Sequence, residues 1–313
     1  MMNYKSNKMF SKLVSVVLCL IIFACNNNTK ETNEIENDDV DTSQVVNDVL
    51  AEINTNLVLD QNINYQVPTP NELFSIIKDL DVTFDASLLN SIENSDKYTN
   101  GLLQALNFGV YSADLAFAAS FGASNEALKY FGTVKTIGDN LKVSNAFDQT
   151  VFNRIQKNIE NNNIDSLFTI SNETYFNAYS YLEDNDRGST LSLIIFGGWI
   201  EGLYIMTNIE KYTEGSELSY RISDQRFTYE NLLGFMAKYQ DDELVSDMMN
   251  ELSELEEIFL SFEQTEEEVI TTETKEGKFN LDGGVTLNMN IDQFNLLKDK
   301  VNELRTSIVE ATI

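Results

Sequence analysis

Residues 191–206, LSLIIFGGWIEGLYIM, form the longest strongly apolar run outside the N-terminus and contain the only tryptophan, Trp199. As a helix, this run would cover roughly 24 Å at about 1.5 Å per residue, which is less than the roughly 30 Å hydrocarbon layer of a membrane. Glu201 and three glycines also interrupt it. The run is long for one strand, and the polar residues Ser189 and Asn208 suit helix ends. We therefore predict a buried helix rather than a membrane span.

Two faces made of small residues are expected to pack together. Gly198 and Gly202 stand four residues apart, which leaves one face of the predicted helix without side chains. Close packing must offset the roughly 1 kcal/mol that each glycine costs in helix propensity. A second set of small residues recurs every four positions between residues 98 and 121, at Gly101, Ala105, Gly109 and Ala113. Because such ridges favour a close helix crossing, we expect this ridge to face Gly198 and Gly202.

Two acidic residues, Asp114 and Glu201, lie beside these small faces. A buried carboxylate needs a partner or a raised pKa. Structural carboxylates far outnumber catalytic ones, so we expect both acids to belong to a satisfied buried network rather than to a catalytic pair.

The N-terminus carries a motif typical of bacterial lipoproteins. Three lysines precede an apolar segment, 13–23, and the sequence Ile-Phe-Ala-Cys ends at Cys25. A charged region, an apolar region and a small residue before the cut mark a secretory signal. The four residues resemble the lipobox, whose cysteine is acylated. We expect a signal peptide at 1–24 and lipidation of Cys25, in preference to an ordinary signal or a transmembrane anchor.

The segment after Cys25 supports an anchor. Residues 26–41, NNNTKETNEIENDDVD, contain almost no apolar residue, so we expect a disordered acidic tether at 25–42. Stable attachment needs more than one acyl chain, which a lipidated cysteine supplies. Asn26 is not the aspartate of enterobacterial inner-membrane retention. The resemblance therefore implies the outer membrane, with its periplasmic and surface faces both open.

Composition narrows the classes of function. Loss of residues 1–24, with three lysines and no acidic residue, would change the formal charge from −29 to −32. Such a charge disfavours nucleic acid as a partner. Cys19 lies in the signal, so we expect no disulfide, and the chain has no histidine. The sequence therefore predicts no metal, no cofactor and no histidine-dependent catalytic site.

The sequence contains none of the short catalytic or ligand-binding motifs that we considered. No phosphate-binding glycine loop, nucleophile elbow or dinucleotide fingerprint occurs. Segments 184–188 and 280–283 resemble parts of calcium-binding loops. In the first, Arg187 stands where an oxygen ligand is required, and in the second, Lys278 would occupy the first ligand position of the loop. We interpret both segments as turns.

Helical spacing continues through most of the chain, which has two prolines in total. Thr69 and Pro70 give a strong helix start, Ser124 is an expected N-cap, and Asn290 with Gln293 is expected to cap the last helix. The remaining expected helices cover 45–53, 98–121, 151–159, 164–182, 189–212, 218–239 and 241–262. The helices on either side of Gly122 look similar to a tetratricopeptide pair, but no repeat returns about 34 residues later.

The C-terminal part differs in composition. Residues 241–274 hold thirteen acidic and no basic residues, which we interpret as a solvated acidic surface, with a cation-binding surface as the alternative. After residue 262 the chain is rich in threonine and glutamate, and Asp282-Gly283-Gly284 separates alternating segments. This pattern predicts a loop with a small hairpin.

Four segments carry a family resemblance: VPTPNELFSIIKDL, LNFGVYSADLAFAASF, EALKYFGTVKTIGDNL and GGWIEGLYIMT. Together they resemble a family of Bacteroidetes-type helical lipoproteins, from about Val67 to the C-terminus. The resemblance implies a compartment but no activity, so no functional residue is carried over.

The sequence therefore predicts an all-α fold, either an antiparallel helical bundle or an irregular helical array, with a small β-hairpin near the C-terminus. We expect a helical domain at 43–262, then a polar loop, the hairpin and a terminal helix at 263–313. The favoured function is a lipid-anchored, non-enzymatic binding or structural module for an envelope protein or for a small ligand near Trp199. The alternative is a hydrolase that uses carboxylates alone, such as a glycoside hydrolase.

Overall fold

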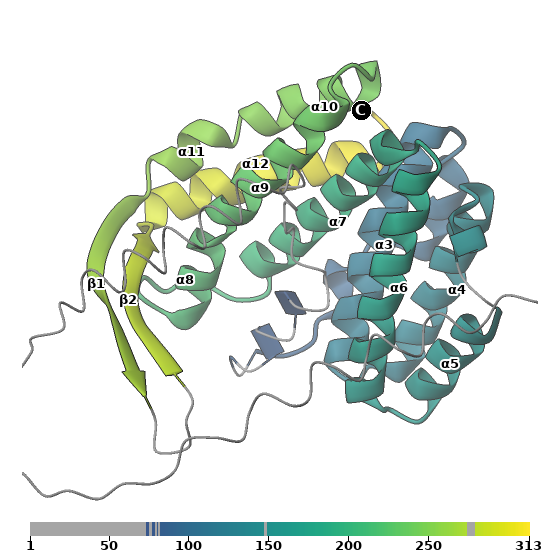
Figure 1. Ribbon diagram of the computed structural model, residues 1–313, viewed down its shortest axis with the longest axis horizontal. Helices are drawn as coiled ribbons and strands as arrows, with labels where there is room; N and C mark the ends of the chain where they lie inside the picture. The colour runs from purple at the N-terminus through teal and green to yellow at the C-terminus, as the bar shows by residue number, and fades with distance from the viewer. Residues whose placement is uncertain (1–72, 75–76, 79, 81, 147–148, 274–278) are drawn as a thin grey trace, which may run out of the picture. The chain divides into compact units, whose positions relative to one another are not determined.

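The computed structural model describes residues 73–74, 77–78, 80, 82–146, 149–273 and 279–313, which belong to one compact unit spanning 64–313 (Figure 1). The predictions for the signal peptide, Cys25, the tether, the helix at 45–53 and the cap at Thr69 lie outside the described residues. Helices account for 74% of the interpretable residues, and a two-stranded antiparallel hairpin lies near the C-terminus. The predicted fold class is confirmed.

The elements follow one another along the chain in three groups. The first comprises η1 (Ala86–Leu88), η2 (Ile92–Lys97), α3 (Gly101–Ser120), α4 (Ser124–Asn140), η3 (Val143–Ala146), α5 (Gln149–Glu160) and α6 (Ile164–Asp184). The second comprises α7 (Gly188–Asn208), α8 (Glu217–Ser223), α9 (Gln225–Met236), η4 (Ala237–Tyr239), α10 (Glu243–Ser253) and α11 (Glu256–Leu260). The third comprises β1 (Glu263–Glu273), β2 (Phe279–Asn288) and α12 (Ile291–Val309).

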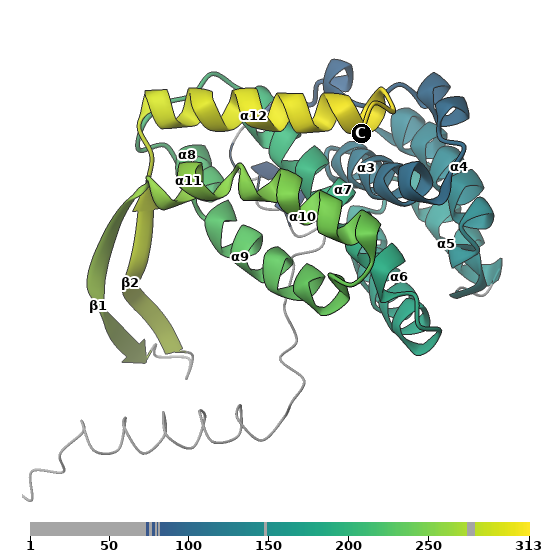
Figure 2. The same ribbon diagram turned by 90° about the horizontal axis from the view of Figure 1, so that it is seen from above.

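Helix α7 is the central element of the fold, as its apolar sequence predicts. It packs most extensively on α3 and also contacts α6, α8, α9, α10 and α12 (Figures 1 and 2). By length and composition, α7 is the one helix among the described residues that could cross a membrane, but 83% of its apolar window is buried in the fold. This burial is that of a core helix, and the prediction of a buried helix is confirmed.

The close crossing of α3 and α7 depends on glycine, though not on every glycine that the spacing suggests. A Cβ added to Gly109 would clash with the Ile194 carbonyl, and one added to Gly197 would clash with the Leu106 carbonyl. At Gly198 an added Cβ would lie 3.3 Å from the Gly109 carbonyl oxygen. The closest backbone approach is therefore centred on Gly109 and Gly197.

Two members of the predicted faces lie elsewhere. An added Cβ at Gly202 would meet the Leu73 side chain, and Gly101 is exposed with no atom within 4 Å of an added Cβ. Ala105 and Ala113 are buried, as the ridge requires. The prediction for Gly101 and Gly202 is wrong, because Gly101 lies eight residues before Gly109 at the exposed start of α3 and Gly202 faces Leu73 rather than α3.

Several helix boundaries differ from the spacing-based prediction. The segments 218–239 and 241–262 each divide into two helices, at Asp224 and at Glu254-Leu255. Serine hydroxyls donate to nearby carbonyls just before each break, from Ser223 to Ser219 and from Ser253 to Asn250. Such bonds compete with the helical pattern and favour its interruption.

The joints around α4 and α7 are turns, as expected, but their caps differ. Gly122 has a φ of +70° and follows α3, while Ser124 is the first residue of α4 and bonds to Asn162 instead of capping the helix. The predicted Ser124 cap is therefore wrong. Between α6 and α7 the predicted turn is confirmed, with Asp186 at a φ of +56° and no side-chain cap from Arg187.

The hairpin is longer than the sequence suggests, and its glycines do not form the turn. Strands β1 and β2 pair antiparallel, and Asp282 and Gly284 both lie inside β2. Gly284 has a φ of +106° and stands opposite Glu267, next to a shift in the pairing register. This positive φ beside a register shift is typical of a bulge, so the prediction of a turn at 282–284 is wrong.

Helix α12 closes the unit. Its start is the capping box predicted from Asn290 and Gln293, in which each side chain bonds to the backbone N–H of the other residue, at 3.0 and 2.8 Å. The helix lies along α7 and also contacts α3 (Figure 2). It thereby brings residues from the end of the chain against the central helix pair.

Candidate functional site

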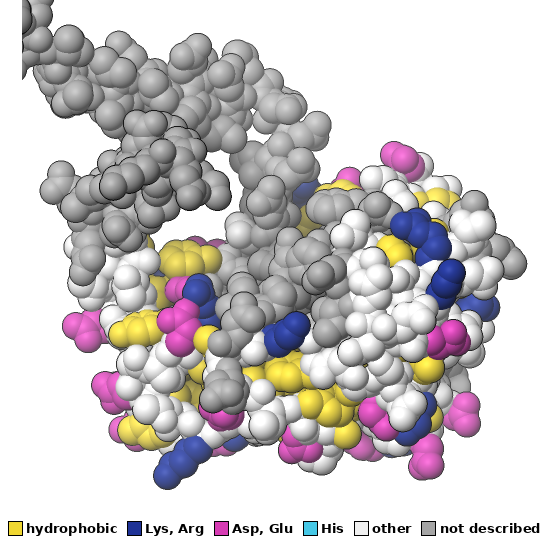
Figure 3. Space-filling view, turned by 90° about the horizontal axis from the view of Figure 1, so that it is seen from below, with side chains coloured by type: hydrophobic (Ala, Val, Ile, Leu, Met, Phe, Trp, Pro, Cys, Tyr) yellow, Lys and Arg dark blue, Asp and Glu magenta, His cyan; other side chains and the backbone are white. Residues whose placement is uncertain are grey.

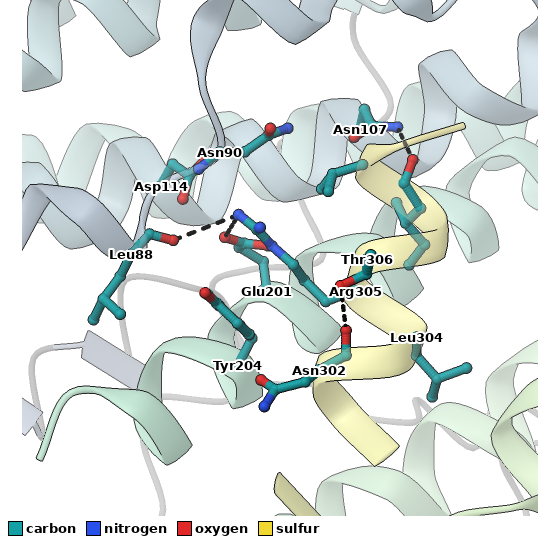
Figure 4. Close-up of polar contacts among 12 residues, drawn as sticks. Leu88, Asn90, Asn107, Asp114, Glu201, Tyr204, Asn302, Leu304, Arg305 and Thr306 are labelled. Atoms are coloured by element: carbon teal, nitrogen blue, oxygen red, sulfur yellow. Dashed lines mark hydrogen bonds and ion pairs between the residues drawn. The ribbon is translucent and has the colours of Figure 1, made fainter. Parts of the chain in front are cut away.

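Three ionisable side chains from distant parts of the chain meet in the core. Asp114 comes from α3, Glu201 from α7 and Arg305 from α12 (Figure 4). Both carboxylate residues are 0% exposed, and the side chain of Arg305 is 13% exposed. We refer to these three residues as the acid–arginine cluster. It is the most strongly perturbed set of ionisable groups in the described part of the chain, which makes it the first place to look for function.

The guanidinium of Arg305 holds Glu201 with two parallel contacts. Its Nε lies 3.0 Å from Glu201 Oε2 and its Nη2 lies 3.1 Å from Oε1. Nη2 also approaches the Leu88 carbonyl oxygen at 3.5 Å, and the guanidinium carbon stands 4.4 Å from the centre of the Tyr204 ring. Bidentate ion pairs and arginine–aromatic stacking are both stronger when shielded from water. Arg305 is therefore fixed from three sides.

Asp114 is the second acid beside this pair. Its Oδ2 accepts a hydrogen bond from the Asn90 N–H at 3.2 Å. Burial, and then the charge of Glu201, raise the pKa of Asp114 well above its ordinary value, although Arg305 opposes the shift. A buried carboxyl beside a second carboxylate is favoured in its neutral, protonated form. Burial and the neighbouring acid therefore both favour a neutral Asp114.

Arg305 opposes the effect of burial on Glu201, and Glu201 does the same for Arg305. Burial raises the pKa of Glu201, but the charge and hydrogen bonds of Arg305 oppose this. For Arg305, burial lowers the pKa, while Glu201 more than offsets that effect and the net pKa is raised. Among the described residues, Asp114 Oδ1 has no hydrogen-bond partner. The ion pair therefore favours the charged forms of Glu201 and Arg305, and Asp114 is the least well satisfied member of the cluster.

A layer of amide and hydroxyl groups surrounds the cluster. The Asn90 amide donates to the Tyr98 hydroxyl at 3.0 Å, and that hydroxyl donates to the Val309 carbonyl at 3.0 Å. The Tyr130 hydroxyl donates to the Asn90 carbonyl at 2.9 Å. Burial raises the pKa of both tyrosines, so both hydroxyls remain protonated donors. This layer ties the segment before α3 to α4 and to the end of α12.

The arrangement is suited to holding helices together rather than to acting on a ligand. A glycosidase needs its two carboxyl groups on either side of a bond in an open cleft. Asp114 and Glu201 are both fully buried, and Glu201 is held by the bidentate contact with Arg305. Across the described ranges, no group of three or more aspartate, glutamate, cysteine or histidine side chains could hold a metal ion.

Trp199 also makes its contacts within the core. Its indole N–H donates to Gln225 Oε1 at 3.1 Å, and its ring packs near Tyr229 and Phe259. The residue is 5% exposed. A shallow depression at the surface is lined by Arg154, Asn158, Ser166, Thr169 and Ile170, none of which belongs to the acid–arginine cluster. The indole of Trp199 is therefore buried and its N–H is already paired, so a ligand near Trp199 stays a prediction.

The structure brings together the two acids that the sequence singled out, and it adds partners that the sequence analysis missed. Arg305 is the most important omission. It stands four residues after Val301 and three before Ile308, so it lies on the buried face of its helix. A lone arginine on such a face signals a buried acidic partner. Asn90 and Tyr204 gave no comparable signal.

Comparison of the chain with protein-family models, with curated proteins and with solved structures finds no match.

Proposed function

We propose that this chain is a lipid-anchored protein of the bacterial cell envelope, attached through acylated Cys25 after removal of residues 1–24. The observation that carries the proposal is the order of charged region, apolar region and Ile-Phe-Ala-Cys in the sequence. The acidic residues 26–41 would then separate the folded unit from the membrane. The absence of an aspartate after Cys25 favours the outer membrane.

We further propose that the folded unit is a non-enzymatic binding or structural module. The support comes from the acid–arginine cluster, in which both acids are fully buried and Arg305 holds Glu201 with a bidentate contact. On the face shown in Figure 3, acidic and basic side chains lie scattered among uncharged groups. A carboxylate-only hydrolase, the alternative, would have to use acids other than Asp114 and Glu201.

Metabolic labelling with a palmitate analogue tests the anchor. Wild-type protein should incorporate the label and sediment with membranes, whereas Cys25→Ala should lose the label and accumulate as an unprocessed precursor. Cys19→Ala is a matched control, because it removes the other cysteine of the chain and should leave labelling unchanged. Labelling and processing that persist in Cys25→Ala would refute the anchor.

Cross-linking in intact cells tests the module. Protein cross-linked on the surface of the folded unit should yield a reproducible partner that depends on the fold, and Gly197→Leu, which should unfold the α3–α7 crossing, should lose it. A partner that is retained by the unfolded variant would count against a folded binding surface.

A further inference from the structure

The outer edge of strand β1 is open. Strands β1 and β2 form a two-stranded sheet, and the described residues place no further strand beside β1. The β1–β2 hairpin extends away from the helices at the point where α11 ends and α12 begins (Figures 1 and 2). An edge strand presents a row of unpaired backbone N–H and C=O groups that another chain can pair with. At 11 residues, β1 is long for an unprotected edge.

The charge of β1 determines which chain could pair with it. The strand, EQTEEEVITTE, contains five glutamates and no basic residue. Glu263 and Glu266 are exposed, as are Gln264 and Thr265 between them. Each of these residues also has a regular cross-strand partner in β2, so the backbone here is extended and preformed.

A second copy of the chain is a poor partner for this edge. Antiparallel pairing of two β1 strands would place glutamates opposite or diagonal to glutamates, and like charges in cross-strand pairs are destabilising. Lysine or arginine in the added strand would instead form favourable cross-strand pairs. The glutamates therefore disfavour self-association and favour a cationic partner.

We propose that the free edge of β1 binds an extended, lysine- or arginine-rich segment of another protein by strand addition. In this mode the backbone hydrogen bonds supply affinity and the alternating side chains supply selectivity. Pairing would centre on Glu263–Glu267, where the register with β2 is continuous before the shift. The inference rests on the proposed role as a binding module and is independent of the lipid anchor.

Peptide binding to the purified full-length protein in detergent tests the proposal. The probe is a fluorescent nine-residue peptide in which lysine alternates with valine, and the readout is fluorescence anisotropy. The key control is the same peptide with every internal backbone amide N-methylated, which keeps the charge but cannot donate hydrogen bonds to a neighbouring strand along either edge. Loss of several hydrogen bonds of about 1 kcal/mol each should weaken its binding at least about tenfold.

Variants of the protein locate the site. Glu263→Lys with Glu266→Lys should weaken binding of the unmodified peptide at least about tenfold. The matched control is Asp247→Lys with Glu257→Lys, which makes the same charge change at exposed positions of α10 and α11. It should change binding by less than about threefold. Circular dichroism should show that all variants retain their helices.

Three results would overturn the proposal. Equal binding of the N-methylated peptide would show charge attraction without strand addition. An equal loss in the control double variant would place binding on the general acidic surface. No binding of the unmodified peptide would mean that the glutamates merely protect the edge. A failure of the Cys25 experiment would leave these measurements unaffected, because the peptide is tested on purified protein.

Discussion

Charged side chains are buried where α3 crosses α7, whereas they are exposed to water on the β1–β2 hairpin. At the crossing, two carboxylates are fully buried, one of them is paired with a guanidinium, and the pKa of the other is raised well above its ordinary value. On the hairpin, glutamates such as Glu263 and Glu266 are exposed and rely on water. Burial makes every charge at the crossing depend on a specific partner, whereas a glutamate on the hairpin can change with little effect on the fold.

The largest effect is expected at the glycine contact. Gly197→Leu should destabilise the unit by about 4 kcal/mol or more, because its side chain would have to displace the α3 backbone at the Leu106 carbonyl. Gly198→Leu should be milder, since its Cβ has more space. Thermal unfolding followed by circular dichroism measures both. Gly101→Leu is the control, because it belongs to the same sequence pattern but meets no atom within 4 Å; equal melting of Gly197→Leu and wild type would refute the contact.

The next effect is expected from Arg305→Met. This change leaves Glu201 buried without its cation and should cost about 3–5 kcal/mol in the free energy of unfolding. Adding Glu201→Gln should restore part of the loss, which a double-mutant cycle in urea would measure.

A surface ion pair provides the matched comparison for Arg305. Lys97 and Glu310 lie 2.6 Å apart, but their side chains are 42% and 51% exposed. Lys97→Met should therefore change stability by no more than about 1 kcal/mol. If Arg305→Met lowered the free energy of unfolding by no more than Lys97→Met does, burial would not explain the contribution of the Arg305–Glu201 pair to stability.

The pH dependence of stability should reveal the proton on Asp114. The raised pKa means that the folded state keeps this proton at pH values where the unfolded carboxyl, with a pKa of about 3.9, has lost it. Stability from this group therefore falls as pH rises above about 4, by up to about 1.4 kcal/mol per unit, until the folded pKa is reached. Urea denaturation between pH 5 and 8 should show Asp114→Asn gaining stability relative to wild type as pH rises.

Asp139 is the control with the opposite sign. Hydrogen bonds from Ser144 and Lys135 lower the pKa of its carboxyl. Asp139 therefore stabilises the folded state at pH values above the pKa of the unfolded carboxyl, and this stabilisation is lost as the pH falls through the folded pKa. Asp139→Asn should therefore differ from wild type at neutral pH and converge with it in acid. A pH-independent difference between Asp114→Asn and wild type would refute the neutral Asp114.

The smallest effect on stability is expected on the hairpin. Glu263→Thr with Glu266→Thr should change the free energy of unfolding by about 0.5 kcal/mol or less at each site, because both side chains are exposed. The same change should promote self-association, since it removes like charges that oppose pairing of two edges. Sedimentation velocity would measure the association. A strictly monomeric variant would show that these two charges are not what keeps the edges apart.

The predictable part of the fold came from periodicity and composition. Residues 191–206 predicted the central helix, and Asn290 with Gln293 predicted the start of α12, because both signals act within a few residues. The contact of Gly197 with Leu106 depends on where two helices cross, and local spacing places that point only to within a turn. The breaks at Asp224 and Glu254 follow serines that bond to nearby carbonyls, and the spacing of apolar residues carries no signal for them.

Part of the candidate site could be predicted from local sequence signals, but the pairing of distant residues could not. Asp114 and Glu201 stood out because acids are rare beside faces of small residues, and the network expected for them is present. Arg305 is 104 positions from Glu201, and no local pattern pairs two residues at that separation. The raised pKa of Asp114 follows from its burial and from the charge of Glu201, and both causes depend on the tertiary structure.

The position of Arg305 in the chain also makes the core depend on its last helix. Arg305 lies in α12, 104 positions after Glu201. Without α12, Glu201 would lose the guanidinium that balances its charge, and a buried carboxylate without a partner is strongly destabilising. We therefore expect a chain truncated before α12 to lose the packing of α3 on α7, although both of those helices would still be present.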